Sequence, residues 1–140
     1  MSQGYGGINL SGLKVLVIGR GMTVGRPLSI LLSQKPINTT VTLAHSASKN
    51  LIELIKESDV VIAAMGSAQF IKAEMVKKGS VLVDVGITRD GNQLVGDFDP
   101  KVIEVASAFA PIPGGVGPMT RVILLKNVIE LATSFHHVNQ

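Results

Sequence analysis

The sequence contains no cysteine, so disulfide bonds and thiolate chemistry are excluded. Aromatic residues make up only 4% of its 140 residues, and none is tryptophan, which leaves few stacking platforms for single-stranded nucleic acid. Lys and Arg are scattered and the formal net charge is +3, so no nucleic-acid partner is expected. No apolar run approaches the roughly 18 residues of a membrane span, so no membrane partner is expected either.

The composition is apolar, with 46% hydrophobic and only 16% charged residues. Such a composition indicates strands that are buried on both faces, an outer surface that a partner covers, or both. The length of 140 residues fits one domain. The N-terminal stretch MSQGYGGINLSG lacks the basic and apolar regions of a secretory signal, and we expect a cytoplasmic location.

Apolar runs of strand length alternate with segments of helical pattern. Strands are predicted at residues 14–19, 40–45, 59–66, 80–86 and 107–112. Helices are predicted from Val24 to Leu32, after Asn50, over residues 72–79, from Asp99 to Val105 and over residues 119–135. This alternation predicts an α/β fold, Rossmann-like and doubly wound, in which a mainly parallel sheet carries helices on both faces. We expect residues 1–140 to form a single NAD(P)-binding domain.

Three local signals refine these boundaries. Asn50 with Glu53 has the spacing of a capping box, and Asp90–Gly91 predicts a tight turn. Asp99–Pro100 predicts an N-cap followed by a first-turn proline. Asp97 is the carboxylate to inspect first for a catalytic role, although a structural role as a turn cap is favoured. Asp84 is interpreted as a buried partner at a strand end.

The segment VIGRGMTVGRP joins the first predicted strand to the first helix, and its glycines are Gly19, Gly21 and Gly25. Their spacing is one residue longer than that of the G-x-G-x-x-G fingerprint. Gly19 permits a tight turn, Gly21 lets a pyrophosphate approach the backbone, and Gly25 lets the helix pack on the strand. Free N–H groups at the helix start would hold the phosphates. The segment therefore predicts a dinucleotide site.

The end of the second strand indicates which dinucleotide binds. An NAD site places a carboxylate there for the ribose 2′-hydroxyl, but this chain has AHSASKN, which contains no acid. His45, Ser46 and, in the glycine turn, Arg20 suit a 2′-phosphate instead. The residues favour NADP over NAD.

The stretch APIPGGVGPMT combines prolines with glycines directly before the last helix. Glycine supplies backbone freedom and removes side-chain bulk, whereas proline adds stiffness. A plain loop needs only one or two such residues, so we expect this segment to fit closely against a specific partner.

The segments VIGRGMTVGRP, VLVDVGI and PGGVGPMT together resemble the cofactor domain of bifunctional methylenetetrahydrofolate dehydrogenase/methenyltetrahydrofolate cyclohydrolase. The resemblance runs from about Gly7 to about Phe135. It implies an NADP-dependent oxidation of 5,10-methylenetetrahydrofolate to the methenyl form and hydrolysis of that product to 10-formyltetrahydrofolate. It thereby implies a role in one-carbon metabolism and purine biosynthesis, and a homodimer in the full-length enzyme.

The resemblance also carries roles to single positions. Gly19, Arg20 and Gly21 match the phosphate turn, His45 and Ser46 match the contact to the adenosine ribose, and Ile87 matches a position near the nicotinamide.

The resemblance further implies that the proline- and glycine-rich loop lines the face where the nicotinamide and the substrate meet. Its glycines would leave backbone N–H groups bare beside flat rings, and its prolines would hold the loop in place. The loop residues in this expectation are Pro113, Gly114, Gly115, Val116, Gly117, Pro118 and Thr120.

The family's catalytic tyrosine and lysine, in a Y-x-x-x-K arrangement, belong to an N-terminal domain. Tyr5 has no lysine four residues later, and Gly4–Leu13 instead resembles the stretch just after the family's interdomain junction. Residues 1–12 are therefore interpreted as a remnant of that junction. We expect no catalytic residue and no metal site in this chain.

Two alternatives stay open at this stage. The chain could be a complete nucleotide-sensing domain without enzymatic activity that dimerises through its apolar surface. It could also be the cofactor domain of another NADP dehydrogenase, such as a shikimate-type enzyme, although the stretch PGGVGPMT argues against this. If the resemblance holds, the isolated chain binds cofactor and does not turn over.

Overall fold

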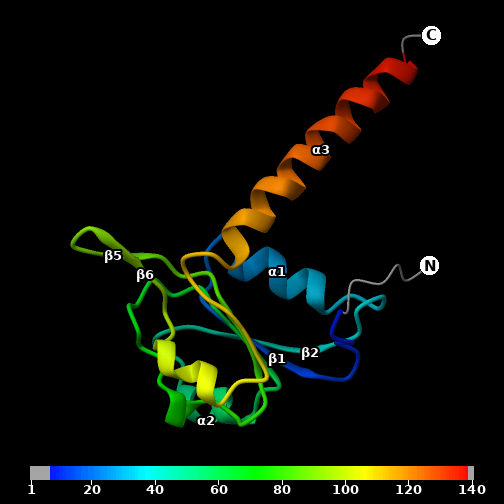
Figure 1. Ribbon diagram of the computed structural model, residues 1–140. Coiled ribbons are helices and arrows are strands. Elements are labelled where there is room, and N and C mark those ends of the chain that lie inside the picture. The colour runs from blue at the N-terminus through cyan, green and yellow to red at the C-terminus, as the bar shows by residue number, and fades with distance from the viewer. Residues whose placement is uncertain (1–6, 139–140) are drawn as a thin grey trace.

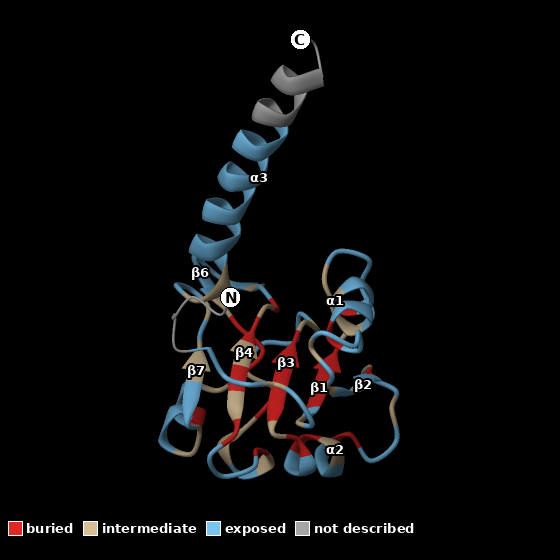
Figure 2. Cartoon of the chain, turned by 90° about the vertical axis from the view of Figure 1, so that its right-hand side faces the viewer, coloured by how far each residue is buried: buried red, intermediate tan, exposed pale blue. Residues whose placement is uncertain are grey.

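A five-stranded parallel sheet forms the centre of the computed structural model, which describes residues 7–138. The strands lie in the order β2-β1-β3-β4-β7 (Figures 1 and 2). Continuous Val, Ile and Leu runs form the central strands because both sheet faces are covered. The prediction of a parallel, doubly wound sheet is confirmed. The bounds are β1 Lys14–Ile18, β2 Thr40–Ala44, β3 Val60–Ala63, β4 Val81–Asp84 and β7 Ala108–Ala110.

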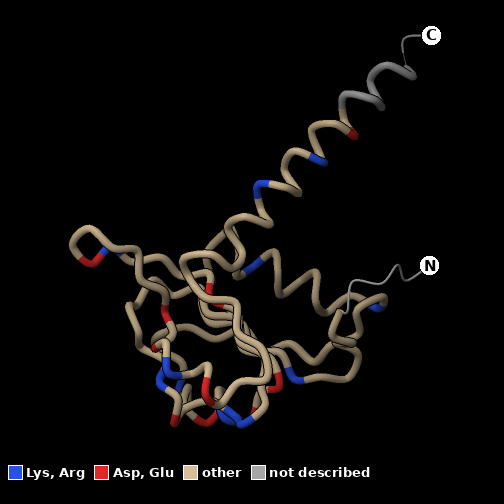
Figure 3. The backbone as a smooth tube through the Cα atoms, in the orientation of Figure 1, with Lys and Arg blue, Asp and Glu red and all other residues tan. Residues whose placement is uncertain are grey.

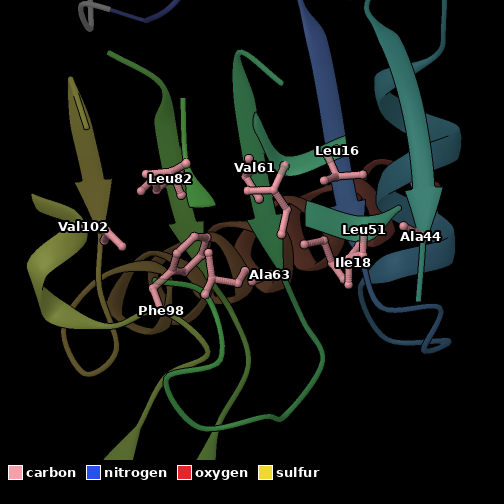
Figure 4. Packing of buried hydrophobic residues seen from close by; sticks show 12 residues of the cluster. Leu16, Ile18, Ala44, Leu51, Val61, Ala63, Leu82, Phe98 and Val102 are labelled. Atoms are coloured by element: carbon pink, nitrogen blue, oxygen red, sulfur yellow. The ribbon is translucent and has the colours of Figure 1, made fainter. Parts of the chain in front are cut away.

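Two helices cover opposite faces of this sheet, α1 (Gly25–Leu32) after β1 and α2 (Leu51–Glu57) after β2. Because side chains alternate along a strand, β1 contributes to both layers. Leu16 and Ile18 pack in the core that includes α2, shown in Figure 4. Val15 and Val17 pack in the core on the α1 side. The prediction of helices on both faces is confirmed.

Two short connections are 3-10 turns instead of the predicted α-helices. The turn η1 covers only Ala73–Met75 of the predicted helix 72–79, because Val76 has an extended backbone (φ −98°, ψ 150°). The turn η2 covers Pro100–Glu104. Its predicted cap is confirmed, since the Asp99 carboxylate accepts a hydrogen bond of 3.0 Å from the Lys101 N–H.

The predicted capping box before α2 is wrong. Asn50 lies in the left-handed region (φ 56°, ψ 36°) and its side chain makes no capping hydrogen bond. A capping side chain reaches the helix N–H groups from an extended backbone, which this residue does not have. The predicted Asp90–Gly91 turn, in contrast, is confirmed. It joins the antiparallel strands β5 (Thr88–Asp90) and β6 (Gln93–Val95), which project as a hairpin in Figure 1.

The last helix, α3 (Val116–Val138), begins before the predicted start at residue 119 and projects away from the sheet (Figures 1 and 2). Its charged residues are Arg121, Lys126 and Glu130, whereas many of the other charges lie at the opposite end of the molecule (Figure 3). Over residues 7–138, no helix is long and apolar enough to cross a membrane. Over residues 116–131 of α3, whose side chains the structure describes, the large apolar side chains that are more than half exposed are Met119, Val122, Ile123, Leu124, Leu125, Val128, Ile129 and Leu131.

Candidate dinucleotide site

The glycine turn lies at the carboxyl edge of the sheet, at the point where the strand order changes from one side of β1 to the other. From β1 the chain crosses to β2 on one side, and it then returns to β3 on the other side of β1. Because the two connections lie on opposite faces, a crevice opens between β1 and β3, which is where ligands of doubly wound folds bind.

Two of the three glycines are required by packing. Gly19 has φ +119°, and a Cβ there would overlap the carbonyl group of Ala64. A Cβ on Gly25 would overlap the carbonyl group of Gly19. Gly21 differs from both, because a Cβ there would meet no atom within 4 Å. Gly19 and Gly25 therefore close the turn, whereas Gly21 leaves its outer side open.

The turn presents free hydrogen-bond donors at the start of α1. Within the described part of the chain, the N–H groups of Gly21, Met22 and Thr23 meet no acceptor. They lie at the helix end where the backbone dipole favours an anion. A cavity of about 220 Å³ opens beside them. It is lined by Gly21, Thr23, Val24, Gly25, Ala64, Met65, Gly66, Val85, Gly86 and Ile87.

The end of β2 lies next to the glycine turn, since the Gly19 N–H donates to the Ala44 carbonyl at 2.8 Å. The Nδ1 atom of His45 accepts a hydrogen bond from the Ala47 N–H at 3.2 Å. In a neutral imidazole this leaves the proton on Nε2, which is available as a donor to a ligand. Arg20 and Ser46 are exposed on the same edge.

The proline- and glycine-rich loop is held by its own chain. Gly114 has φ +107°, and a Cβ on Gly115 would lie 2.5 Å from the Pro111 carbonyl oxygen. The Gly115 N–H donates to that same oxygen at 2.8 Å. The expectation of a bare N–H group is therefore wrong for Gly115. Pro113 and Gly114 line neither cavity of this edge.

Val116 and Thr120 do reach the site, although they lie in the first turns of α3 and not in a loop. They line an apolar cavity of about 510 Å³ that extends over α1, β3 and β4. Thr23 and Val24 line both this cavity and the smaller one, so the two are adjacent. The sequence interpretation missed Thr23 and Val24, although their place between Gly21 and Gly25 was a usable signal. Gly117 and Pro118 lie on α3 outside both cavities.

The loop that follows β3 was also missed, and a carboxylate holds it. The Asp97 side chain is fully buried and accepts hydrogen bonds from the N–H groups of Met65 (2.7 Å), Gly66 (3.2 Å) and Ser67 (2.6 Å). Asp97 is thus the structural turn cap that was predicted. The sequence did hold a signal for this loop, namely its place directly after the third predicted strand. The carboxyl ends of parallel strands lie at the same edge of the sheet, where the ligand binds.

Asp84 ends β4 and is 1% exposed. Its carboxylate accepts hydrogen bonds from the N–H groups of Asp97 (3.0 Å) and Phe98 (3.2 Å). Burial raises the pKa of Asp84 above its usual value, and the neighbouring Asp97 raises this pKa further, against the opposing backbone hydrogen bonds. The prediction of a buried partner at a strand end is confirmed.

Parallel strands, the crevice between β1 and β3, and a glycine turn with free N–H groups define a Rossmann-like dinucleotide-binding domain. Residues 4–136 match the family described as tetrahydrofolate dehydrogenase/cyclohydrolase, NAD(P)-binding domain. The chain belongs to this family. This confirms the predicted resemblance and the NAD(P) cofactor, and it argues against the alternative of a cofactor domain from another dehydrogenase family.

Solved structures of related enzymes agree. The bifunctional enzyme FolD, methylenetetrahydrofolate dehydrogenase/cyclohydrolase, from Campylobacter jejuni is 37% identical with a TM-score of 0.85, over 90% of this chain and 45% of that chain. A 5,10-methylenetetrahydrofolate dehydrogenase from the silkworm Bombyx mori is 36% identical with a TM-score of 0.84, over 93% of this chain and 48% of that chain. The methylenetetrahydrofolate dehydrogenase-cyclohydrolase (FolD) from Trypanosoma brucei, complexed with NADP and an inhibitor, is 36% identical with a TM-score of 0.79. The match covers 87% of this chain and 44% of that chain. The chain thus spans less than half the length of each.

Proposed function

We propose that this chain binds NADP in the crevice between β1 and β3 and serves as the cofactor-binding part of a methylenetetrahydrofolate dehydrogenase/cyclohydrolase. The observation that carries the proposal is the set of free N–H groups on Gly21, Met22 and Thr23 at the start of α1. They fit a pyrophosphate because each can donate to a phosphate oxygen while the helix dipole favours its negative charge. The open side of Gly21 admits that group to the backbone.

The residues at the end of β2 support NADP over NAD. The exposed Arg20 guanidinium and Ser46 hydroxyl, with the His45 Nε2 donor, offer one cation and two hydrogen-bond partners to a 2′-phosphate. The loop 45–49 contains no acid, so a 2′-phosphate meets no carboxylate there. The Trypanosoma brucei relative was solved with NADP, in agreement with this assignment.

The nicotinamide would lie where the two cavities meet, against Thr23 and Val24. Ile87, between β4 and β5, and Thr120, on α3, flank that position. When bound, the nicotinamide supplies hydride transfer. The chain's own part is to orient the ring and to exclude water from one side of it, because the lining is mainly apolar. The segment Pro113–Thr120 would border the substrate.

Catalysis on tetrahydrofolate derivatives would need further residues. Hydrolysis of a methenyl group requires an activated water and a polarising group, and we assign neither role to a residue of this chain. Since the chain spans less than half of its solved relatives, we propose that it binds cofactor and does not turn over alone. The exposed apolar residues of α3 support a further protein surface against it, within a cytoplasmic homodimeric enzyme.

The test is ligand-dependent thermal stabilisation of the purified chain. NADP should raise the apparent Tm in proportion to its concentration, because a ligand of the native state adds to stability. NAD should require a higher concentration for the same shift. Equal shifts, or a preference for NAD, would refute the role given to Arg20, His45 and Ser46. Adding the part of a relative that lies outside the matched region should then give dehydrogenase activity, which we expect the chain alone not to show.

A further inference from the structure

The loop Ala64–Ser67 forms the wall of the smaller cavity that faces the glycine turn. Ala64, Met65 and Gly66 line the cavity opposite Gly21 and Val24. This wall has no regular secondary structure of its own, since β3 ends at Ala63. Its shape therefore depends on what holds its backbone.

A single side chain holds it. The buried Asp97 carboxylate accepts from three consecutive N–H groups of this loop, at 2.6 to 3.2 Å. Three bonds to one charged acceptor fix the direction of three successive peptide planes. They also occupy these N–H groups, so the loop offers them to no phosphate. Anion binding is left to the turn at residues 21–23.

Asp97 is itself anchored to the sheet. Its N–H donates to the Asp84 carboxylate at 3.0 Å, and the Phe98 N–H donates to the same group at 3.2 Å. Asp84 belongs to β4, which pairs with β3 in the central sheet. The two carboxylates thus connect a rigid strand, β4, to an irregular loop. The loop is distant in sequence, since Met65 lies 32 positions before Asp97.

The glycines beside the two carboxylates give independent support. A Cβ on Gly86 would overlap the Asp97 carboxylate, and a Cβ on Gly96 would overlap the Asp84 carboxylate. Both residues are buried, and neither has the positive φ that would by itself require glycine. Glycine is needed at these positions because the carboxylates fill the space beside the backbone.

We infer that Asp97 is a positioning residue for the cofactor: it fixes the loop Ala64–Ser67 as one wall of the site, and Asp84 fixes Asp97. The inference rests on the proposed NADP site. According to this inference, the loop Ala64–Ser67 helps to bind only the pyrophosphate and nicotinamide end of NADP. The residues assigned to the 2′-phosphate, Arg20 and His45, follow β1 and β2, and within the described residues neither makes a hydrogen bond to this loop.

The experiment compares two probes by calorimetric titration, NADP and adenosine 2′,5′-bisphosphate, which lacks the nicotinamide half. Asp97→Asn turns a charged acceptor into an amide whose NH₂ group faces N–H donors. We expect Kd for NADP to rise by about 10-fold or more, with Kd for the bisphosphate unchanged. Asp59→Asn is the matched control at the opposite edge of the sheet, where Asp59 accepts from the Lys14 N–H at 2.9 Å. It should change neither Kd.

Gly86→Ala is the second variant, since it pushes on the Asp97 carboxylate without removing its charge. It should show the same selective loss of NADP. Equal loss of both probes, or of neither, would overturn the inference. If the wild-type chain binds neither probe, the proposed function fails instead.

A measurement on the wild-type chain covers the case in which both variants fail to fold. Hydrogen exchange at the N–H groups of Met65 and Ser67 should be as slow as in β3, because each is bonded to a buried acceptor. Fast exchange at these positions would contradict the positioning role.

Discussion

Gly25 lies directly against the carbonyl group of Gly19, so closely that no Cβ fits between the start of α1 and the end of β1. Both contacting groups are backbone, and neither can move without shifting the helix from the sheet. Gly25→Ala should therefore lower the free energy of unfolding by about 1–3 kcal/mol or more, as overpacking does. Urea unfolding followed by circular dichroism would measure this change.

Gly21→Ala is the matched control for this prediction. A Cβ there meets no atom within 4 Å, so stability should change by less than about 0.5 kcal/mol. NADP affinity should nevertheless fall, because the methyl group would occupy the side on which the pyrophosphate approaches. Equal unfolding energies for both variants would mean that the turn is not closed by the contact between Gly19 and Gly25.

The fold could be predicted from the sequence because its signals are local. Strands such as β1 are continuous apolar runs, and the turns at Gly19 and at Asp90–Gly91 follow from residues within a few positions. The errors have the same origin. The capping box at Asn50 depends on one backbone angle, and the end of η1 depends on the extended Val76, neither of which a spacing rule reports.

The candidate site could be predicted only where its residues belong to a motif. Gly19, Gly21 and Gly25 follow one another, and they form the predicted turn. The loop at Met65–Ser67 carries no motif, and it joins the site because Asp97, some 30 positions away, holds it. Such long-range hydrogen bonds follow from the strand order, which periodicity alone does not determine.

Arg20→Ala tests the assignment of the 2′-phosphate. Removing the guanidinium should raise Kd for NADP by about 10-fold or more, because a charged hydrogen bond to phosphate is lost. Kd for NAD, which has no 2′-phosphate, should stay within about twofold. Titration of the wild type and the Arg20→Ala variant with NADP and NAD measures the two changes in Kd. A uniform loss for NAD and NADP would place Arg20 at the pyrophosphate instead.

Gly115 and Gly117 should respond in opposite ways to alanine. A Cβ on Gly115 would lie 2.5 Å from the Pro111 carbonyl oxygen, whereas one on Gly117 meets nothing within 4 Å. Gly115→Ala should cost about 1–3 kcal/mol of stability and displace the start of α3. Gly117→Ala should add up to about 1 kcal/mol, because alanine favours a helix over glycine. Thermal unfolding of the two variants would show the contrast, and a stable Gly115→Ala protein would contradict the close contact.

Asp59 connects the amino ends of two strands and gives the stability a defined dependence on pH. The hydrogen bond from the Lys77 ammonium at 2.6 Å, and then the one from the Lys14 N–H, hold the pKa of Asp59 below its usual value of 3.8. A lowered folded-state pKa means that this stabilisation is complete above pH 3.8 and is lost as the pH falls through the folded pKa. Asp59→Asn should therefore be less stable than the wild type at neutral pH.

The expected difference is about 0.5–1 kcal/mol, since the Lys77 side chain is half exposed and the pair is screened by water. The difference should shrink as the pH falls below 3.8 and through the lowered folded-state pKa, where the wild-type carboxylate itself becomes protonated. Urea unfolding of both proteins at neutral and acidic pH gives the difference directly, and contributions from other acids cancel in it. A gap that stays constant down to acidic pH would show that Asp59 acts through packing and not through its charge.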